Sequence, residues 1–123
     1  MGASFNKSEI TQNSTTNLYE DFIQKTVNSN KIVVFSKTNC SYCTRAKALL
    51  SDLNLEYNTI ELDRNEQCPE SNCQSLIKSL VYQTRIRTVP QIFINGQLIG
   101  GYTDLESMSR DKQKFQEFLN KKN

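Results

Sequence analysis

Two cysteines two residues apart, Cys40 and Cys43, stand where a buried strand should end and an amphipathic helix should begin. This junction constrains the fold more than any other feature of the chain. The preceding segment 31–36 (KIVVFS) is short, β-branched and aromatic, which indicates a buried strand. The apolar residues that follow recur at i, i+3, i+4 and i+7, the spacing of a helix that packs one face on a core: Ala46, Leu49, Leu50 and Leu53. Cys40 is therefore expected near the N-cap and Cys43 in the first helical turn.

A helix start favours a thiolate, because unpaired backbone N–H groups and the positive end of the helix dipole gather there. We therefore expect a lowered pKa for the Cys40 thiol, as is typical of helix N-termini and C-x-x-C sequences. Lys37 can add positive charge, as can Arg45 and Lys47 if their side chains turn back toward Cys40. The thiolate is the attacking species in disulfide exchange, so this pair is a candidate redox site.

The rest of the chain alternates between helix and strand patterns. The segment 55–62 alternates apolar and polar residues as a half-buried strand does, and Asn95-Gly96 is a strong signal for a two-residue hairpin turn. The expected elements are a helix at 16–28, strand 31–36, helix 41–54, strand 55–62, a loop at 63–71, a helix from 74 to about 82, strands 91–94 and 97–100, and helices 104–108 and 111–120. This order predicts an α/β fold with a four-stranded mixed sheet flanked by helices on both faces.

Length and composition indicate one globular domain. The chain has 123 residues, of which 37% are hydrophobic and 23% are charged. A net charge of +2 without a basic run argues against nucleic acid as a partner. No stretch approaches the roughly 20 apolar residues of a membrane span, so no membrane association is expected. The chain has no histidine, which excludes mechanisms that need imidazole as a base or a ligand.

The first residues differ in composition from the rest. Residues 1–15 are rich in Ser, Thr and Asn and have no apolar segment, so we expect a disordered polar leader rather than a secretory signal, and a folded domain at 16–123. Cysteines of cytosolic chains serve catalysis or metal binding more often than structural disulfides. The expected location is therefore cytoplasmic.

Two further cysteines, Cys68 and Cys73, lie on either side of Pro69. A zinc ribbon needs a second C-x-x-C within roughly 20 residues of the first, whereas these two are separated by four residues and begin later. Structural zinc is therefore disfavoured. Free thiols are the first expectation for this pair, with an accessory disulfide or a redox-sensitive pair as the alternatives.

Two later segments have both a structural and a functional interpretation. Thr88-Val89-Pro90 is either a strand-opening proline or a cis-proline that exposes the Val89 backbone beside the dithiol, where an extended peptide can pair with it. The segment 100–104 (GGYTD) is either a turn with a helix cap or a receptor for a small charged ligand, in which the two glycines allow close backbone approach at a helix start.

Taken together, the segments 35–43 (FSKTNCSYC), 88–96 (TVPQIFING) and 99–105 (IGGYTDL) closely resemble the dithiol glutaredoxin family. The resemblance covers about residues 18–120. It implies a thioredoxin-like fold and a groove for glutathione. It also implies a nucleophilic Cys40, a resolving Cys43 and a set of glutathione contacts at Lys37, Tyr42, Gln74, Thr88, Val89, Pro90, Gly101, Thr103 and Asp104.

The roles of these contacts are also carried by the resemblance. Lys37 matches the contact to the glycine carboxylate, and Val89 the position that pairs with the cysteinyl backbone of glutathione. Thr103 and Asp104 match the positions that hold the γ-glutamyl end, with the Asp104 carboxylate facing the ammonium group. Gln74 is the natural match for a contact in the third family helix, although the stretch from Gln74 to Thr88 is about three residues longer than usual.

Ser41 also departs from the pattern of the family, because most dithiol members have proline at this position. A Cys-Ser-Tyr-Cys site resembles that of a subgroup whose members hold a [2Fe-2S] cluster between two monomers, with one nucleophilic cysteine from each and two glutathiones. Replacing proline restores a backbone N–H and relaxes the first turn. Cys40 is thus also a candidate cluster ligand, and a neutral redox adjustment is the alternative explanation.

The expected function is that of a glutathione-dependent thiol-disulfide oxidoreductase that reduces protein-glutathione mixed disulfides and protein disulfides. The resemblance implies glutathione, glutathionylated or disulfide-bonded proteins, and a separate NADPH-dependent glutathione reductase as partners of a monomer. The alternatives are a glutathione-ligated [2Fe-2S] carrier or sensor that forms a cluster-bridged homodimer, and an inert thioredoxin-like binding module. The intact set of Lys37, Cys40, Val89 and Asp104 argues against the inert module.

Overall fold

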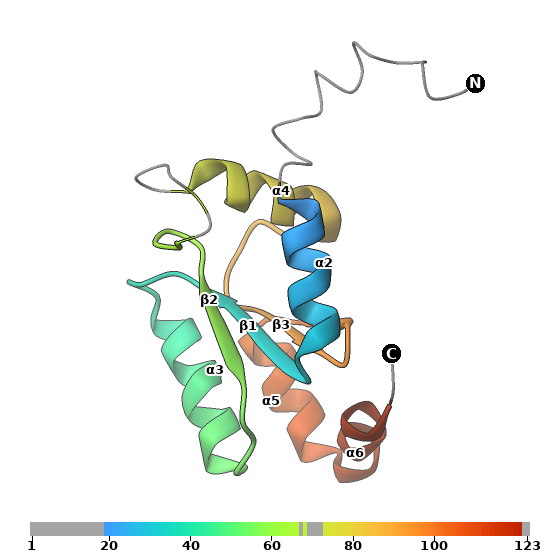
Figure 1. The fold of residues 1–123 in the computed structure, drawn as a ribbon. Coiled ribbons are helices and arrows are strands. Elements are labelled where there is room, and N and C mark those ends of the chain that lie inside the picture. The colour runs from blue at the N-terminus through green and yellow to red at the C-terminus, as the bar shows by residue number, and fades with distance from the viewer. Residues whose placement is uncertain (1–18, 67, 69–72, 122–123) are drawn as a thin grey trace, which may run out of the picture.

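A four-stranded mixed sheet forms the centre of the structure, a computed structural model that describes residues 19–66, 68 and 73–121 (Figure 1). The strand order is β2-β1-β3-β4. β1 (Ile32–Ser36) runs parallel to β2 (Asn58–Glu61) and antiparallel to β3 (Gln91–Ile94), which is antiparallel to β4 (Gln97–Gly100). The predicted mixed sheet is confirmed, whereas the predicted leader at 1–15 lies outside the described residues.

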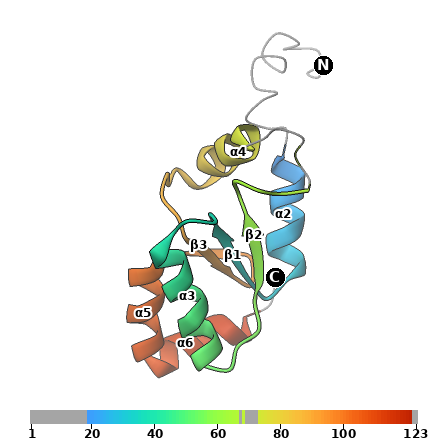
Figure 2. The same ribbon diagram turned by 90° about the vertical axis from the view of Figure 1, so that its left-hand side faces the viewer.

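Helices cover both faces of this sheet. Figure 2 shows α2 on one side of the sheet and α3 with α5 on the other. One layer consists of α2 (Glu20–Ser29) and α4 (Gln74–Thr84), and the other of α3 (Ser41–Asp52), α5 (Tyr102–Arg110) and α6 (Lys112–Asn120). No helix within the described part of the chain is long and apolar enough to span a bilayer.

The central strand β1 supplies both hydrophobic cores, because successive side chains of a strand point to opposite faces. Val33 and Phe35 join the core beneath α2 and α4, and Ile32 and Val34 join the core beneath α3, α5 and α6. All five residues of β1 are buried. This explains why the strand reads as a continuous apolar run instead of an alternating one.

Several boundaries differ from those predicted, each for a local reason. The predicted strand 55–62 is shorter because Leu55 is tied to the end of α3, its N–H donating to the Leu50 carbonyl oxygen at 2.9 Å. Helix α5 begins at Tyr102, ahead of the predicted residue 104, because the Asp104 carboxylate accepts the Gly101 N–H at 2.9 Å and caps the first turn. The first predicted helix, 16–28, is α2, and its residues 16–18 lie outside the described range.

The expectation of free thiols at Cys68 and Cys73 is wrong, since the two form a disulfide in the structure. Their Cα atoms are 5.8 Å apart, within the span that a disulfide bridges. Cys73 is the N-cap of α4, and both side chains are buried in the core beneath α2 and α4. Packing into one core brings the two sulfurs together, and the accessory disulfide is the alternative that the structure contains.

Candidate active site

The two cysteines of the C-x-x-C sequence occupy the expected positions at the start of α3. Cys40 is the N-cap residue, and the backbone N–H of Cys43 donates to its Sγ at 3.1 Å. The structure pairs the two as a disulfide, with Cα atoms 5.2 Å apart. Cys40 is half-buried, whereas Cys43 is 1% exposed. An incoming sulfur therefore reaches Cys40 first, and the helix-start N–H is placed to stabilise negative charge on Cys40 Sγ.

Two of the cations near the dithiol in the sequence have side-chain partners in the structure. The Arg45 guanidinium lies over the Tyr42 ring, 5.1 Å from its centroid. Lys47 Nζ forms an ion pair at 2.9 Å with Glu61 at the end of β2. Each of these two cations thus has a partner of its own in the structure, an aromatic face for Arg45 and a carboxylate for Lys47. Lys37 is half-buried in the loop before Cys40.

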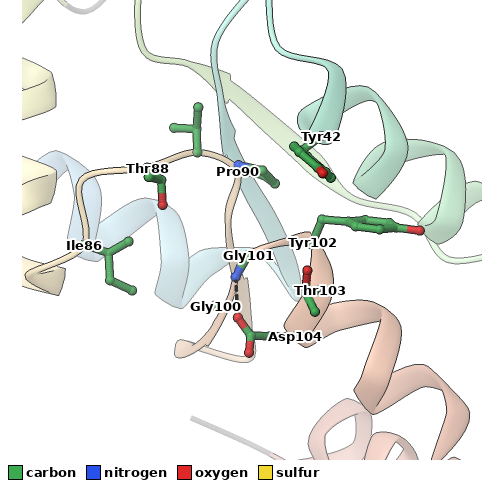
Figure 3. Close-up of a pocket in the computed structure, with 10 residues that line it drawn as sticks. Tyr42, Ile86, Thr88, Pro90, Gly100, Gly101, Tyr102, Thr103 and Asp104 are labelled. Carbon is green, nitrogen blue, oxygen red and sulfur yellow. Dashed lines mark hydrogen bonds between the residues drawn. The ribbon is translucent and has the colours of Figure 1, made fainter.

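Beside the dithiol lies a groove, here called the cis-proline groove, with a volume of about 370 Å³. Figure 3 shows it between the start of α3, the segment before β3 and the start of α5. The Val89–Pro90 peptide bond is cis, which is the second of the two interpretations that the sequence left open. The groove is lined by Tyr42, Ile86, Thr88, Val89, Pro90, Gly100, Gly101, Tyr102, Thr103 and Asp104. Three segments that are far apart in the sequence thus form one surface.

Val89 connects the groove to the dithiol. Its carbonyl oxygen lies 3.8 Å from Cys40 Sγ. Val89 precedes β3, and within the described residues its backbone N–H has no backbone hydrogen-bond partner. A free strand-like N–H next to a reactive sulfur can pair with the backbone of an extended peptide. The geometry thus favours a ligand whose extended backbone pairs with this segment while its sulfur faces Cys40.

The opposite wall of the groove is the first turn of α5. Asp104 is held by the Gly101 N–H, and a Cβ atom at Gly100 would overlap the Asp104 carboxylate. Gly100 also has a φ of +126°, which L side chains rarely adopt. The exposed side chains of Thr103 and Asp104 stand beside the free N–H groups of a helix N-terminus. The site combines donors for a carboxylate with a carboxylate for a cation.

Gln91 holds the segment that precedes β3 through side-chain hydrogen bonds, a role that the sequence reasoning missed. This residue is 1% exposed, and its Nε2 donates to the carbonyl oxygens of Ile86 at 2.8 Å and Thr88 at 3.1 Å. Both acceptors belong to the segment that lines the groove. The available signal was a glutamine in an otherwise apolar strand, because a polar side chain in a buried strand needs hydrogen-bond partners.

Asp63 holds the loop before Cys40, and it too was missed. Its carboxylate accepts the Thr38 hydroxyl at 2.8 Å and the Thr38 backbone N–H at 3.1 Å. Burial raises the pKa of Asp63, but the hydrogen bonds from Thr38 outweigh it and leave the pKa below its usual value of 3.8. In the parallel pairing of β1 with β2, Ser36 lies opposite Glu61, and two residues further along each segment the same register places Thr38 opposite Asp63. The contact could therefore be anticipated once the two strands were known to pair.

Two residues predicted to contact the ligand do not line the cis-proline groove. Lys37 lies in the loop before Cys40, and Gln74 lines a separate pocket along α4. The other seven predicted contacts line one groove: Tyr42, Thr88, Val89, Pro90, Gly101, Thr103 and Asp104. Their assignment as ligand contacts stays a prediction, as do those of Lys37 and Gln74.

Comparisons with known proteins point to one family. The family model described as Glutaredoxin matches residues 32–99. The chain is 45% identical over 89 residues to glutaredoxin-2, mitochondrial, of Bos taurus, which covers 72% of this chain and 54% of that protein. Its identity to glutaredoxin-2, mitochondrial, of Homo sapiens is 44% over 89 residues, covering 72% and 51%. The chain thus spans about half the length of these curated relatives.

A solved structure with the same fold is the buckwheat glutaredoxin-glutathione complex. It superposes with a TM-score of 0.74 at 40% sequence identity, covering 85% of this chain and 90% of that one. The thioredoxin-like architecture expected from the sequence is therefore shown by structure as well as by sequence.

Proposed function

Because this chain belongs to the glutaredoxin family, we propose that it is a glutathione-dependent thiol-disulfide oxidoreductase that reduces protein-glutathione mixed disulfides and protein disulfides. The observation that carries the proposal is the position of Cys40. The residue is half-buried, and its sulfur accepts a helix-start N–H at 3.1 Å and lies 3.8 Å from the Val89 carbonyl oxygen at the edge of the cis-proline groove.

The reaction begins when the Cys40 thiolate attacks the glutathione sulfur of a protein mixed disulfide. A bond forms between Cys40 Sγ and that sulfur as the bond between glutathione and the protein cysteine breaks. The protein leaves as a thiolate and takes a proton from water. A second glutathione thiolate then attacks the glutathionyl sulfur on Cys40, which releases glutathione disulfide and restores the Cys40 thiolate.

The cis-proline groove supports recognition of glutathione rather than of the protein. The Val89 backbone is placed to pair with the cysteinyl unit of the tripeptide. The N-terminus of α5 with Thr103 suits the γ-glutamyl carboxylate, and the Asp104 carboxylate suits its ammonium group. The Tyr42 ring lines the groove, and its centroid lies 6.0 Å from the centroid of the Tyr102 ring.

Cys43 resolves protein disulfides in this scheme. A buried thiol cannot be the first point of attack, but it lies one helical turn from Cys40 and can displace a partner protein bound there. The product is the Cys40–Cys43 disulfide. Reduction by glutathione, itself renewed by a separate NADPH-dependent reductase, completes the cycle.

We also propose a monomeric enzyme in the cytoplasm, which fractionation of tagged protein would test.

The test separates the two cysteines. Cys40→Ser should abolish glutathione-dependent reduction of a peptide-glutathione mixed disulfide. Cys43→Ser should retain that activity while losing most of its reduction of a protein disulfide. Turnover retained by Cys40→Ser would overturn the proposal, and equal loss of both activities in Cys43→Ser would overturn the division of roles.

The cluster-bridged dimer is the second candidate, favoured by one observation. Cys40 is half-buried at the helix start, and the following Ser41 is exposed and has the backbone N–H that a proline would lack. In that form Cys40 of each copy and two glutathiones would hold a [2Fe-2S] cluster, which would supply electron storage or transfer to an acceptor. Purification without oxygen in the presence of glutathione tests it: a brown dimer supports the cluster, and a colourless active monomer contradicts it.

A further inference from the structure

A second groove, here called the α4 groove, runs along one face of α4 and has a volume of about 490 Å³. Its α4 side chains recur at helical spacing, from Gln74 through Ile77 and Val81 to Tyr82. The remaining wall is formed by residues that follow the helix, Arg85 and Arg87. The groove shares no lining residue with the cis-proline groove.

The charge on this groove is positive. Lys78, Arg85 and Arg87 line it, and none of the three forms an ion pair within residues 19–66, 68 and 73–121. Helix α4 contains no Asp or Glu. Cations gathered without a carboxylate partner favour an anionic occupant.

The floor and rim of the groove suit a peptide better than a mononucleotide or a nucleic-acid strand. Ile77 and Val81 give it an apolar floor. Tyr82 is 43% exposed, and the Arg85 guanidinium lies 4.9 Å from the centroid of its ring. Exposed tyrosine and arginine side by side are characteristic of protein-binding surfaces. The net charge of +2 on the whole chain is small for a nucleic-acid-binding protein.

The backbone of Arg85 adds a third observation. This residue is the C-cap of α4 and has φ 65° and ψ 18°, the left-handed conformation that favours glycine. An arginine at a position where glycine is preferred makes the cap less stable. The Arg85 side chain lines the α4 groove and is not part of either hydrophobic core.

The α4 groove is next to the proposed reaction site along the chain. Arg87 lines the α4 groove, and the following residue, Thr88, lines the cis-proline groove. In Figures 1 and 2 the segment after α4 leads directly to β3, beside the start of α5. The two grooves thus meet at consecutive residues of one segment.

From these observations we propose that the α4 groove binds an acidic segment of the protein substrate, next to the cysteine that carries glutathione. The inference rests on the proposed function. Carboxylates of that segment contact Lys78, Arg85 and Arg87, and an apolar side chain lies on Ile77 and Val81. The groove thus adds a preference for acidic proteins to a site whose first contacts are with glutathione.

The test compares short peptides that carry one cysteine as a mixed disulfide with glutathione. In one peptide glutamates flank the cysteine, and in the matched peptide glutamines do. At low ionic strength the wild type should have roughly a tenfold lower KM for the acidic peptide, because each of three surface ion pairs contributes roughly twofold. The preference should weaken as salt is added. Equal KM values for the two peptides would overturn the inference.

Substitution then assigns the preference to the groove. The triple variant Lys78→Gln, Arg85→Gln, Arg87→Gln should lose the preference for the acidic peptide and retain the wild-type KM for the mixed disulfide of glutathione with 2-mercaptoethanol. A rise in that second KM would overturn the inference, because the three cations would then serve glutathione itself.

A matched control removes the same charge elsewhere. Lys31, Lys112 and Lys114 are exposed and lie outside both grooves, so their triple change to glutamine should keep the preference. Loss of the preference in this control would overturn the assignment to α4. If the wild type fails to turn over the 2-mercaptoethanol mixed disulfide, the proposed function itself is wrong. Turnover without a preference for the acidic peptide removes only the further inference.

Discussion

Replacement of Gln91 tests how the cis-proline groove is held in shape. Gln91→Met keeps the length of the side chain and removes both hydrogen bonds from Nε2, to the Ile86 carbonyl oxygen at 2.8 Å and the Thr88 carbonyl oxygen at 3.1 Å. Each bond contributes about 0.5–1.5 kcal/mol to the free energy of unfolding, so the loss is about 1–3 kcal/mol. Gln91 Oε1 is buried without a hydrogen-bond partner in the described residues, and its removal offsets part of that loss.

The net expectation is a loss of about 1–2 kcal/mol. For a domain of this size it lowers the Tm by roughly 5–10 °C, measured by circular dichroism with the cysteines held in one redox state. Because Ile86 and Thr88 line the groove, the KM for a glutathione mixed disulfide should also rise. Gln113→Met on the exposed surface of α6 is the control and should leave both quantities near the wild-type values.

A second variant at the same position replaces the hydrogen-bond donor of Gln91 by a negatively charged acceptor. Gln91→Glu places a carboxylate opposite two carbonyl oxygens, so at neutral pH it should destabilise the fold more than Gln91→Met does. Burial raises the pKa of the new carboxyl group, so acidification should protonate it and recover part of the lost stability. A Gln91→Met protein with the wild-type Tm and KM would refute the reasoning, as would a Gln91→Glu protein whose stability loss relative to wild type does not change with pH.

The remaining predictions concern the two walls of the site. Gly100→Ala should raise the KM for a glutathione mixed disulfide about tenfold or more and lower the Tm, because its Cβ would overlap the Asp104 carboxylate at a φ of +126°. Gly101→Ala is the matched control for stability, since its Cβ would meet its nearest neighbour, a backbone oxygen, at 3.5 Å; an equal fall in Tm for the two changes would contradict this explanation. Asp63→Asn should lower the free energy of unfolding most at pH values above 3.8, the usual pKa of the group. Folding lowers the pKa of Asp63, so its ionised carboxylate stabilises the fold. That contribution is lost as the pH falls through the pKa of the folded state. Urea denaturation of both proteins across the acid range measures this difference in stability, and a difference independent of pH would contradict the role of the carboxylate.

Features that depend on neighbouring residues were predictable from the sequence. The hairpin at Asn95-Gly96 and strand 91–94 lie where the turn signal and the apolar run place them. Cys40 is the N-cap of α3 because the helical spacing of the following apolar residues defines where that helix begins. The order of strands and helices, and hence the mixed sheet, follows from the same local periodicities.

Side-chain partners far apart in the sequence were not predictable in this way. Lys47 could add positive charge near Cys40 only if it turned back, and the pairing of β1 with β2 instead brings Glu61 within 2.9 Å of it. Cys68 and Cys73 were expected to be free, but packing of both into the core beneath α2 and α4 joins them. In each case the competing partner exists only after the sheet has formed.

The sequence by itself determined the chemistry of the site, because a C-x-x-C sequence between a strand and a helix places a reactive sulfur at a helix start whatever surrounds it. Only the tertiary structure decided what holds that sulfur beside its groove. The parallel register of β1 and β2 brings Asp63 to Thr38, and the position of Gln91 at the start of β3 fixes the segment that carries Val89. Such contacts depend on the register between strands, which residues close together in the sequence do not specify.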